Sequence, residues 1–207
     1  MTWMVTSDGY EAHLSYPVTD AFDIGRIAHS LGQITRFNGH ASRPYSVAEH
    51  SLLVADVAEH MGLDVFGQFA ALMHDAHEAF TGDATSPAKA EIGAAWSVFE
   101  NRFAHLVARK FDYVTANTVF HHEIHAADMT ALAIERYHLL PHRQPCGTPS
   151  TPWPCLAQLH AVHHFVDLNT REREEMTWRD WRDRFLDRFH ELQFARAEAS
   201  TLERRAA

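Results

Sequence analysis

Only two cysteines, Cys146 and Cys155, occur among the 207 residues of the sequence. A disulfide framework needs more cysteines in a smaller chain, and these two are not paired at the spacing of a zinc ribbon. Both lie in a proline-rich stretch from Pro141 to Cys155. We therefore expect two reduced thiols in a loop.

Long hydrophobic runs are also absent. No uninterrupted apolar run approaches the ~20 residues that a membrane helix needs. The first five residues, Met1 to Val5, lack the basic start and the apolar stretch of a signal peptide. The sequence thus predicts a cytoplasmic protein that does not bind membranes.

Positive charge is scarce, because 18 Lys and Arg residues face 27 Asp and Glu residues and the net charge is −9. Nucleic-acid binding depends on Lys and Arg that neutralise phosphates, so nucleic acid is not an expected partner. An acidic protein can still bind a small phosphate ester if a metal ion supplies local positive charge. A small-molecule partner is therefore favoured.

The residues that are present describe an ordinary globular chain, 46% hydrophobic and 22% charged. Its length suits one domain over residues 1–207. Ser7-Asp8-Gly9 is a turn signal, which predicts a small β-hairpin within residues 1–20. Apolar residues at helical spacing then predict an all-α (mainly α) fold, with a core over about 22–140 and a C-terminal extension over 141–207. The expected helices cover about 22–33, from 46 onward, 65–80, from 86 to about 107, 115–140 and 177–199.

Local signals add detail to two of these helices. Ser46 and Glu49 have the spacing of a capping box, in which each side chain bonds to the other's backbone N–H. The last helix carries an aromatic stripe that suits core packing or a dimer contact.

Four polar residues stand where apolar residues are expected. His50 lies within the stripe of Val47, Val54 and Val57, and the pair His74-Asp75 lies near the end of the next apolar helix. Asp128 has Ala127 and Ala131 as core-like neighbours. A buried imidazole needs a partner, and a buried carboxylate is costly unless a cation is present. Two histidines and two aspartates form a mixed set that suits one divalent ion of Mn, Fe, Co, Ni, Zn or Mg, without choosing between them.

The order of these residues resembles the HD-domain metal-dependent phosphohydrolases, which are named for the His-Asp pair. The match is closest to the branch of bacterial 5'-deoxynucleotidases and phage deoxynucleoside triphosphohydrolases, and it covers about Arg36 to Glu135. The matching segments are Ile34-Thr35-Arg36-Phe37, Tyr45-Ser46-Val47-Ala48-Glu49-His50-Ser51, Leu72-Met73-His74-Asp75-Ala76-His77-Glu78, Thr81-Gly82-Asp83, Pro87-Ala88-Lys89 and Ala127-Asp128. The resemblance implies an HD-domain helical bundle, a nucleotide phosphohydrolase activity and a homodimer.

The resemblance also implies roles for individual residues. His50, His74, Asp75 and Asp128 would ligate one metal ion. Glu78 would position or deprotonate the attacking water, and Asp83 would assist it. Arg36 would bind the substrate phosphate, and Phe37 stands where the deoxynucleotidases have a tryptophan that stacks on the base. Further substrate contacts are expected from Lys89, Ser46 and Thr85, and His40, just before the metal helix, is a candidate donor to a phosphate.

Other interpretations of these residues stay open. Glu78 and Lys89 suit solvated helix positions, and Asp83 suits the N-cap of the next helix. His77 is a candidate ligand of a second metal, and His125 faces the same way as Asp128 on a helix. His122, His163 and His164 suit surface or packing positions. The leading substrate is a (deoxy)nucleoside 5'-monophosphate; the alternatives are a nucleoside triphosphohydrolase, a cyclic-nucleotide phosphodiesterase and a non-catalytic nucleotide-binding module.

Overall fold

The computed structural model describes residues 2–157 and 165–206, so His163 and His164 lie outside the described residues. The described part is mainly helical, with one two-stranded sheet, which confirms the predicted class and the N-terminal hairpin. The strands are β1 (Trp3–Val5) and β2 (Glu11–His13). The helices are α1 (Ile24–Gln33), α2 (Val47–His60), α3 (Val65–Leu72), α4 (Glu78–Thr81), α5 (Ser86–Ile92), α6 (Ala94–Lys110), α7 (Val114–Val119), α8 (His121–Leu139), α9 (Arg171–Glu175) and α10 (Trp178–Ala206), with short 3-10 turns η1 (Thr19–Ala21), η2 (Arg36–Gly39) and η3 (Pro154–Leu156).

The N-terminal hairpin is antiparallel, with Trp3 opposite His13. Its turn contains Gly9 at a φ of 86°, a conformation that glycine adopts without steric cost. Arg26 of α1 donates to Asp8 in this turn with an Nε–Oδ2 distance of 2.7 Å. The hydrogen bond from Thr6 and the guanidinium of Arg26 lower the pKa of Asp8 to about 2. This pair joins the hairpin to the helical body.

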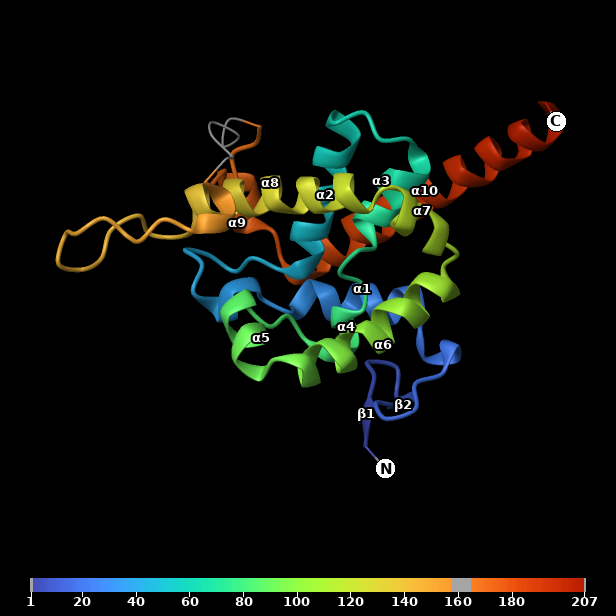
Figure 1. Cartoon of the computed structure of the whole chain (residues 1–207), viewed down its shortest axis with the longest axis horizontal. Coiled ribbons are helices and arrows are strands. Elements are labelled where there is room, and N and C mark those ends of the chain that lie inside the picture. Colours follow the sequence, from blue (N-terminus) through green and yellow to red (C-terminus); the bar gives the residue numbers. More distant parts are fainter. Residues whose placement is uncertain (1, 158–164, 207) are drawn as a thin grey trace.

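Helix α2 lies at the centre of the body and packs against α1, α3, α8 and α10. Its Val47, Val54 and Ala55 are fully buried, and so are Phe69 of α3 and Ile134 of α8. Figure 1 shows α8 crossing the molecule over α2, with the proline-rich stretch projecting beyond its C-terminal end. The two helices that carry His50 and Asp128 therefore lie side by side.

The aromatic stripe of α10 packs inside the protein. Trp181, Phe185, Phe189 and Leu192 are buried, and α10 contacts α1, α2 and α3. The packing interpretation of these residues is thus confirmed, and their buried side chains do not form a dimer contact. Figure 1 shows the C-terminal part of α10 projecting from the body. No helix in the described ranges combines the length and the apolar character that crossing a membrane requires.

Three expected helices are interrupted. The expected helix over 65–80 ends at Leu72, passes through a turn and resumes at Glu78. Gly93, with a φ of 70°, separates α5 from α6, and α7 ends before α8 begins at His121. Hydrophobic periodicity predicted the apolar faces correctly. It does not reveal a break in a helix when the segments on both sides of the break pack on the same core.

The first turn of α2 holds a buried ion cluster. Ser46 caps the helix as predicted, because its Oγ accepts from the Glu49 backbone N–H at 3.2 Å. The Glu49 side chain does not return to the cap as a capping box requires. It instead accepts from Arg43 at 2.7 and 2.8 Å and from Arg173 of α9 at 2.7 Å. The cluster fixes the C-terminal extension to the helix that carries His50.

Replacing Arg173 with alanine should lower the free energy of unfolding by about 1–3 kcal/mol, since Glu49 is fully buried and loses a charged hydrogen-bond donor. Urea denaturation measures this change. Arg171→Ala is the matched control in the same helix, because its ion pair with Glu175 is exposed and such pairs contribute ~0.2–1 kcal/mol. Equal losses in the two variants would contradict a stabilising role for the Glu49 cluster.

Candidate metal centre

The first candidate ligand, His50, comes from the buried first half of α2. Its side chain is fully buried, and its Nδ1 lies 2.5 Å from Oε1 of Glu135. Its Nε2 lies 3.4 Å from Oδ2 of Asp75 and 3.3 Å from Oδ1 of Asp128. One ring nitrogen of His50 is therefore engaged by the fold, and the other faces two carboxylates.

The His74-Asp75 pair lies in the turn between α3 and α4, which corrects the expectation that one continuous helix presents this pair and Glu78. The carbonyl of Met73 at the start of this turn accepts from the Tyr113 hydroxyl at 3.0 Å. The Ala71 carbonyl lies 2.8 Å from Nδ1 of His74, so the Nε2 of His74 faces Oδ2 of Asp75 at 3.1 Å. The turn thus presents both side chains toward His50.

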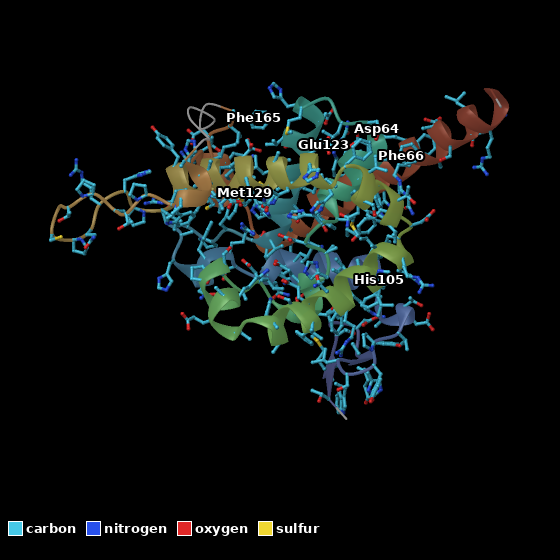
Figure 2. All side chains as sticks on the ribbon, viewed as in Figure 1. Asp64, Phe66, His105, Glu123, Met129 and Phe165 are labelled. Carbon is cyan, nitrogen blue, oxygen red and sulfur yellow. The ribbon has the colours of Figure 1, made fainter. Side chains whose placement is uncertain are left out.

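The last candidate ligand, Asp128, lies on α8, and Met129 marks the neighbouring position on this helix in Figure 2. Its Oδ1 is 3.3 Å from Nε2 of His50 and 4.0 Å from Nε2 of His74. Ligand atoms of His50, His74 and Asp128 all lie within 4.8 Å of one another, and Asp75 lies against both histidines. The structure brings together all four residues that the sequence selected.

This arrangement fits a divalent metal ion. The Nε2 atoms of His50 and His74 are buried and have no hydrogen-bond partner. Each Nδ1 faces an acceptor, which favours a proton there, so that in the neutral ring the Nε2 lone pair is free for a metal ion. A divalent ion between the four groups would coordinate these lone pairs and offset both aspartate charges. The donor set holds no thiolate, as is usual in catalytic rather than structural sites.

The electrostatic couplings within the four residues are strong. Burial and Arg36 lower the pKa of His50, but Glu135, Asp128 and Asp75 outweigh them and raise it well above its ordinary value. Burial raises the pKa of Asp75, but His74 and His50 outweigh it and bring the pKa well below the ordinary value. Both shifts reflect a site in which carboxylates need a cation and imidazoles face negative charge.

The candidate catalytic acids lie beside this centre. Glu78 is 2% exposed, which excludes the solvated interpretation, and its Oε2 is buried without a hydrogen-bond partner. Burial raises its pKa well above the ordinary value, and Asp75 and Asp83 add to the effect. Burial also raises the pKa of Asp83. Thr85, not Asp83, is the N-cap residue of α5, so the capping interpretation of Asp83 is wrong.

The candidate phosphate-binding residue Arg36 lies 3.7 Å from Asp75, measured from Nη1 to Oδ2. Its Nη2 donates to Oε2 of Glu135 at 3.2 Å, and its buried Nε has no hydrogen-bond partner. Burial lowers the pKa of Arg36, but Glu135, Asp83 and Asp75 outweigh it, so the pKa is raised and the guanidinium stays charged. A fixed positive group thus lies next to a candidate metal ligand.

Glu135 is a buried residue beside the candidate centre that the sequence analysis missed. It is fully buried on α8 and contacts His50, Arg36 and the Tyr45 hydroxyl, which donates to Oε1 at 3.0 Å. It stands seven residues after Asp128, two helical turns along the same face. A glutamate beside Ile134 and Ala131 in an apolar stripe was the available signal.

The remaining expected substrate contacts differ in their surroundings. Phe37 has a φ of 56° and lies below the Arg36 guanidinium, with a distance of 5.4 Å to its ring centre. Its ring centroid lies 6.5 Å from that of Trp153, which the sequence analysis did not select. Ser46 is buried as the α2 cap, His40 is exposed, and Thr85 is half-buried without a side-chain cap bond.

Lys89 lies in a second group of charged side chains. Its Nζ is 2.6 Å from Oε1 of Glu100 and 3.9 Å from Oε1 of Glu78, so it is not a freely solvated lysine. His77 is buried, with its Nε2 3.5 Å from the same Glu100 oxygen. His77, Glu78 and Glu100 could chelate an ion, but an ammonium group already lies against Glu100. His125 is exposed and is not part of the His50, His74 and Asp128 group.

Comparison with known proteins agrees with this geometry. The model of the HD domain family matches residues 47–176, more than half of the chain. The chain is 35% identical over 113 residues to an uncharacterized protein of Rhodobacter capsulatus, covering 53% of this chain and 58% of that protein. It is 31% identical over 139 residues to the uncharacterized protein YfdR of Escherichia coli, covering 67% of this chain and 73% of YfdR. The chain therefore belongs to the HD domain family, whose members are generally metal-dependent phosphohydrolases.

Proposed function

We propose that this protein hydrolyses a nucleotide phosphate ester, with a (deoxy)nucleoside 5'-monophosphate as substrate and a nucleoside and inorganic phosphate as products. The observation that carries the proposal is the position of Arg36. Its charged guanidinium lies 3.7 Å from Asp75 and 5.4 Å from the centre of the Phe37 ring, and the Phe37 ring centroid in turn lies 6.5 Å from that of Trp153. A phosphate-binding group, a metal ligand and a surface suited to a base are thus adjacent.

Each group has a chemical task in such a reaction. A divalent ion held by His50, His74, Asp75 and Asp128 would supply positive charge and lower the pKa of water from ~15.7 to about 7–9. Arg36 would bind the phosphate oxygens, because its planar fork matches their geometry. The raised pKa of Glu78 suits a carboxylate that accepts a proton from water, and Asp83 would hold that water in line with the phosphorus.

The charge around the centre favours a single phosphate group. In the part of the chain that the structure describes, Arg36 and Lys89 are the Lys and Arg side chains paired with Asp75 or Glu78. Lys89 is already bound to Glu100 at 2.6 Å. A triphosphate carries more negative charge and needs more cations than this arrangement offers. The monophosphate is therefore the better supported substrate.

Replacing Trp153 with alanine should raise KM for a nucleotide about 10-fold or more, since stacking on a base contributes ~1–3 kcal/mol. The Michaelis constant for ribose 5-phosphate, which has no base, should stay unchanged. Trp3→Ala in the distant hairpin is the control variant. Equal changes in KM for both substrates would contradict a base-binding role of Trp153.

The proposed activity is tested by incubating purified protein with Mn, Co, Ni, Mg or Zn and with nucleoside mono-, di- and triphosphates. Release of inorganic phosphate from the monophosphates with at least one metal is expected. If no metal restores the release of phosphate, pyrophosphate or triphosphate, the proposal fails.

Three alternatives remain: two hydrolases that cleave a different phosphate bond, and a binding module that catalyses no reaction. A triphosphohydrolase would release triphosphate, and a cyclic-nucleotide phosphodiesterase would yield a nucleoside monophosphate. Phosphorus NMR of the products separates both from a monophosphatase. A non-catalytic nucleotide-binding module would bind nucleotide tightly without turnover under any metal. The burial of Glu78 beside the centre supports the enzyme, because a binding module has no need of that carboxylate.

A further inference from the structure

One fully buried carboxylate, that of Glu135, contacts both a candidate metal ligand and the candidate phosphate-binding arginine. Oε1 of Glu135 lies 2.5 Å from Nδ1 of His50, and Oε2 accepts from Nη2 of Arg36 at 3.2 Å. We propose that Glu135 is a positioning residue that fixes His50 for the metal and Arg36 for the phosphate at the same time. This inference rests on the proposed function, because it assumes that a metal and a phosphate bind there.

The first contact determines how His50 presents its ring. A neutral imidazole carries one proton, and the carboxylate at Nδ1 favours that proton on Nδ1. The Nε2 lone pair is then directed toward Asp75 and Asp128, which lie 3.4 and 3.3 Å away. A carboxylate partner also makes the ligating nitrogen more basic than a neutral acceptor does. His74, whose Nδ1 faces the Ala71 carbonyl, has only such a neutral acceptor.

The second contact restricts the Arg36 side chain. Glu135 accepts from Nη2, while Nη1 lies 3.7 Å from Asp75 and the buried Nε has no hydrogen-bond partner. An arginine side chain loses much rotamer freedom when it is ordered. Since Glu135 orders the Arg36 side chain before phosphate binds, phosphate binding does not include the entropic cost of ordering it.

Stability does not account for this carboxylate. A buried ion pair is often no more stabilising than well-packed apolar residues, because desolvation opposes the attraction. The Tyr45 hydroxyl completes the set of partners by donating to Oε1. All three partners converge on a glutamate that reaches no solvent, and two of them are site residues.

The test uses Glu135→Gln, which keeps the side-chain shape and removes the charge. Calorimetric titration with Mn or Co should show metal affinity reduced about 10–100-fold. KM for a nucleoside monophosphate should rise about 10-fold at saturating metal, while kcat changes less. Glu49→Gln is the matched control, because Glu49 is equally buried and ion-paired but binds Arg43 and Arg173 instead. Equal metal affinity and KM in Glu135→Gln and wild type would overturn the inference.

A second measurement needs no variant. Nitrogen-15 NMR of zinc-loaded wild-type protein should show His50 protonated at Nδ1 and coordinated through Nε2, with a strongly downfield Nδ1 proton. Coordination through Nδ1 would overturn the inference and leave the proposed function intact. A wild-type protein that binds none of the divalent metals would overturn both.

Discussion

Replacing Asp128 with asparagine should abolish phosphate release and weaken metal binding by more than the ~10–100-fold that follows loss of an outer partner. Asp128 is the most suitable of the four candidate ligands to replace, since its side chain pairs with His50 and His74 of the same centre. Asparagine keeps the side-chain volume but removes the negative charge that would attract a divalent ion. Metal content after equilibrium dialysis and phosphate release by colorimetric assay give the two readouts.

Glu123→Gln provides the control for this experiment. Glu123 is exposed on the same helix, as Figure 2 shows, and should bind metal and turn over like wild type. Circular dichroism should show both variants folded, because Asp128 retains a 26% exposed side chain at the edge of the core. Full metal content and full activity in the Asp128→Asn protein would show that Asp128 is not a metal ligand.

Replacing Glu78 with glutamine should reduce kcat by about 10²–10⁴-fold while metal affinity stays the same. The side chain is placed to accept a proton, because burial and the neighbouring Asp75 and Asp83 raise its pKa well above the ordinary value. Glutamine cannot accept that proton. The thermal midpoint should not fall, since Oε2 of Glu78 is buried without a partner and burial disfavours its charge.

Steady-state kinetics with calorimetric metal titration separate this effect from loss of the metal. Glu91→Gln, an exposed change on α5, is the control. A Glu78→Gln protein with wild-type kcat would show that another group, with Asp83 as the next candidate, accepts the proton. A variant that also loses the metal would instead make Glu78 a ligand.

The residues of the candidate metal centre could be selected from the sequence because they violate a local rule. His50 and Asp128 occupy apolar stripes, and burying their polar groups without partners costs free energy. A cation shared between them removes this cost, which is why the sequence predicted a metal ion. The structure places these residues within contact distance of one another, although Asp128 is 78 residues after His50. Helical periodicity singled out His50 and Asp128 because it reports which side of each helix is buried, whereas the role of His74 and Asp75 followed from the order of the motifs.

Other parts depended on contacts that periodicity does not describe. The break between α3 and α4 has no glycine or proline to mark it, and the Tyr113 hydroxyl, far along the chain, satisfies the Met73 carbonyl there. Trp153 comes from a proline-rich loop whose path depends on contacts such as the Arg136 guanidinium 5.3 Å from its ring centre. Local sequence cannot place such residues, because tertiary packing selects among many loop paths.

The central claim is that His50, His74, Asp75 and Asp128 hold one divalent ion that nucleotide hydrolysis requires. It is tested most directly by titrating metal-stripped protein with each of Mn, Co, Ni, Mg and Zn while phosphate release from deoxyadenosine 5'-monophosphate is followed. We predict no release from the stripped protein and, with at least one metal, a rise that reaches its plateau at one ion per chain. Full phosphate release in excess chelator, or no release with any metal, would contradict the claim.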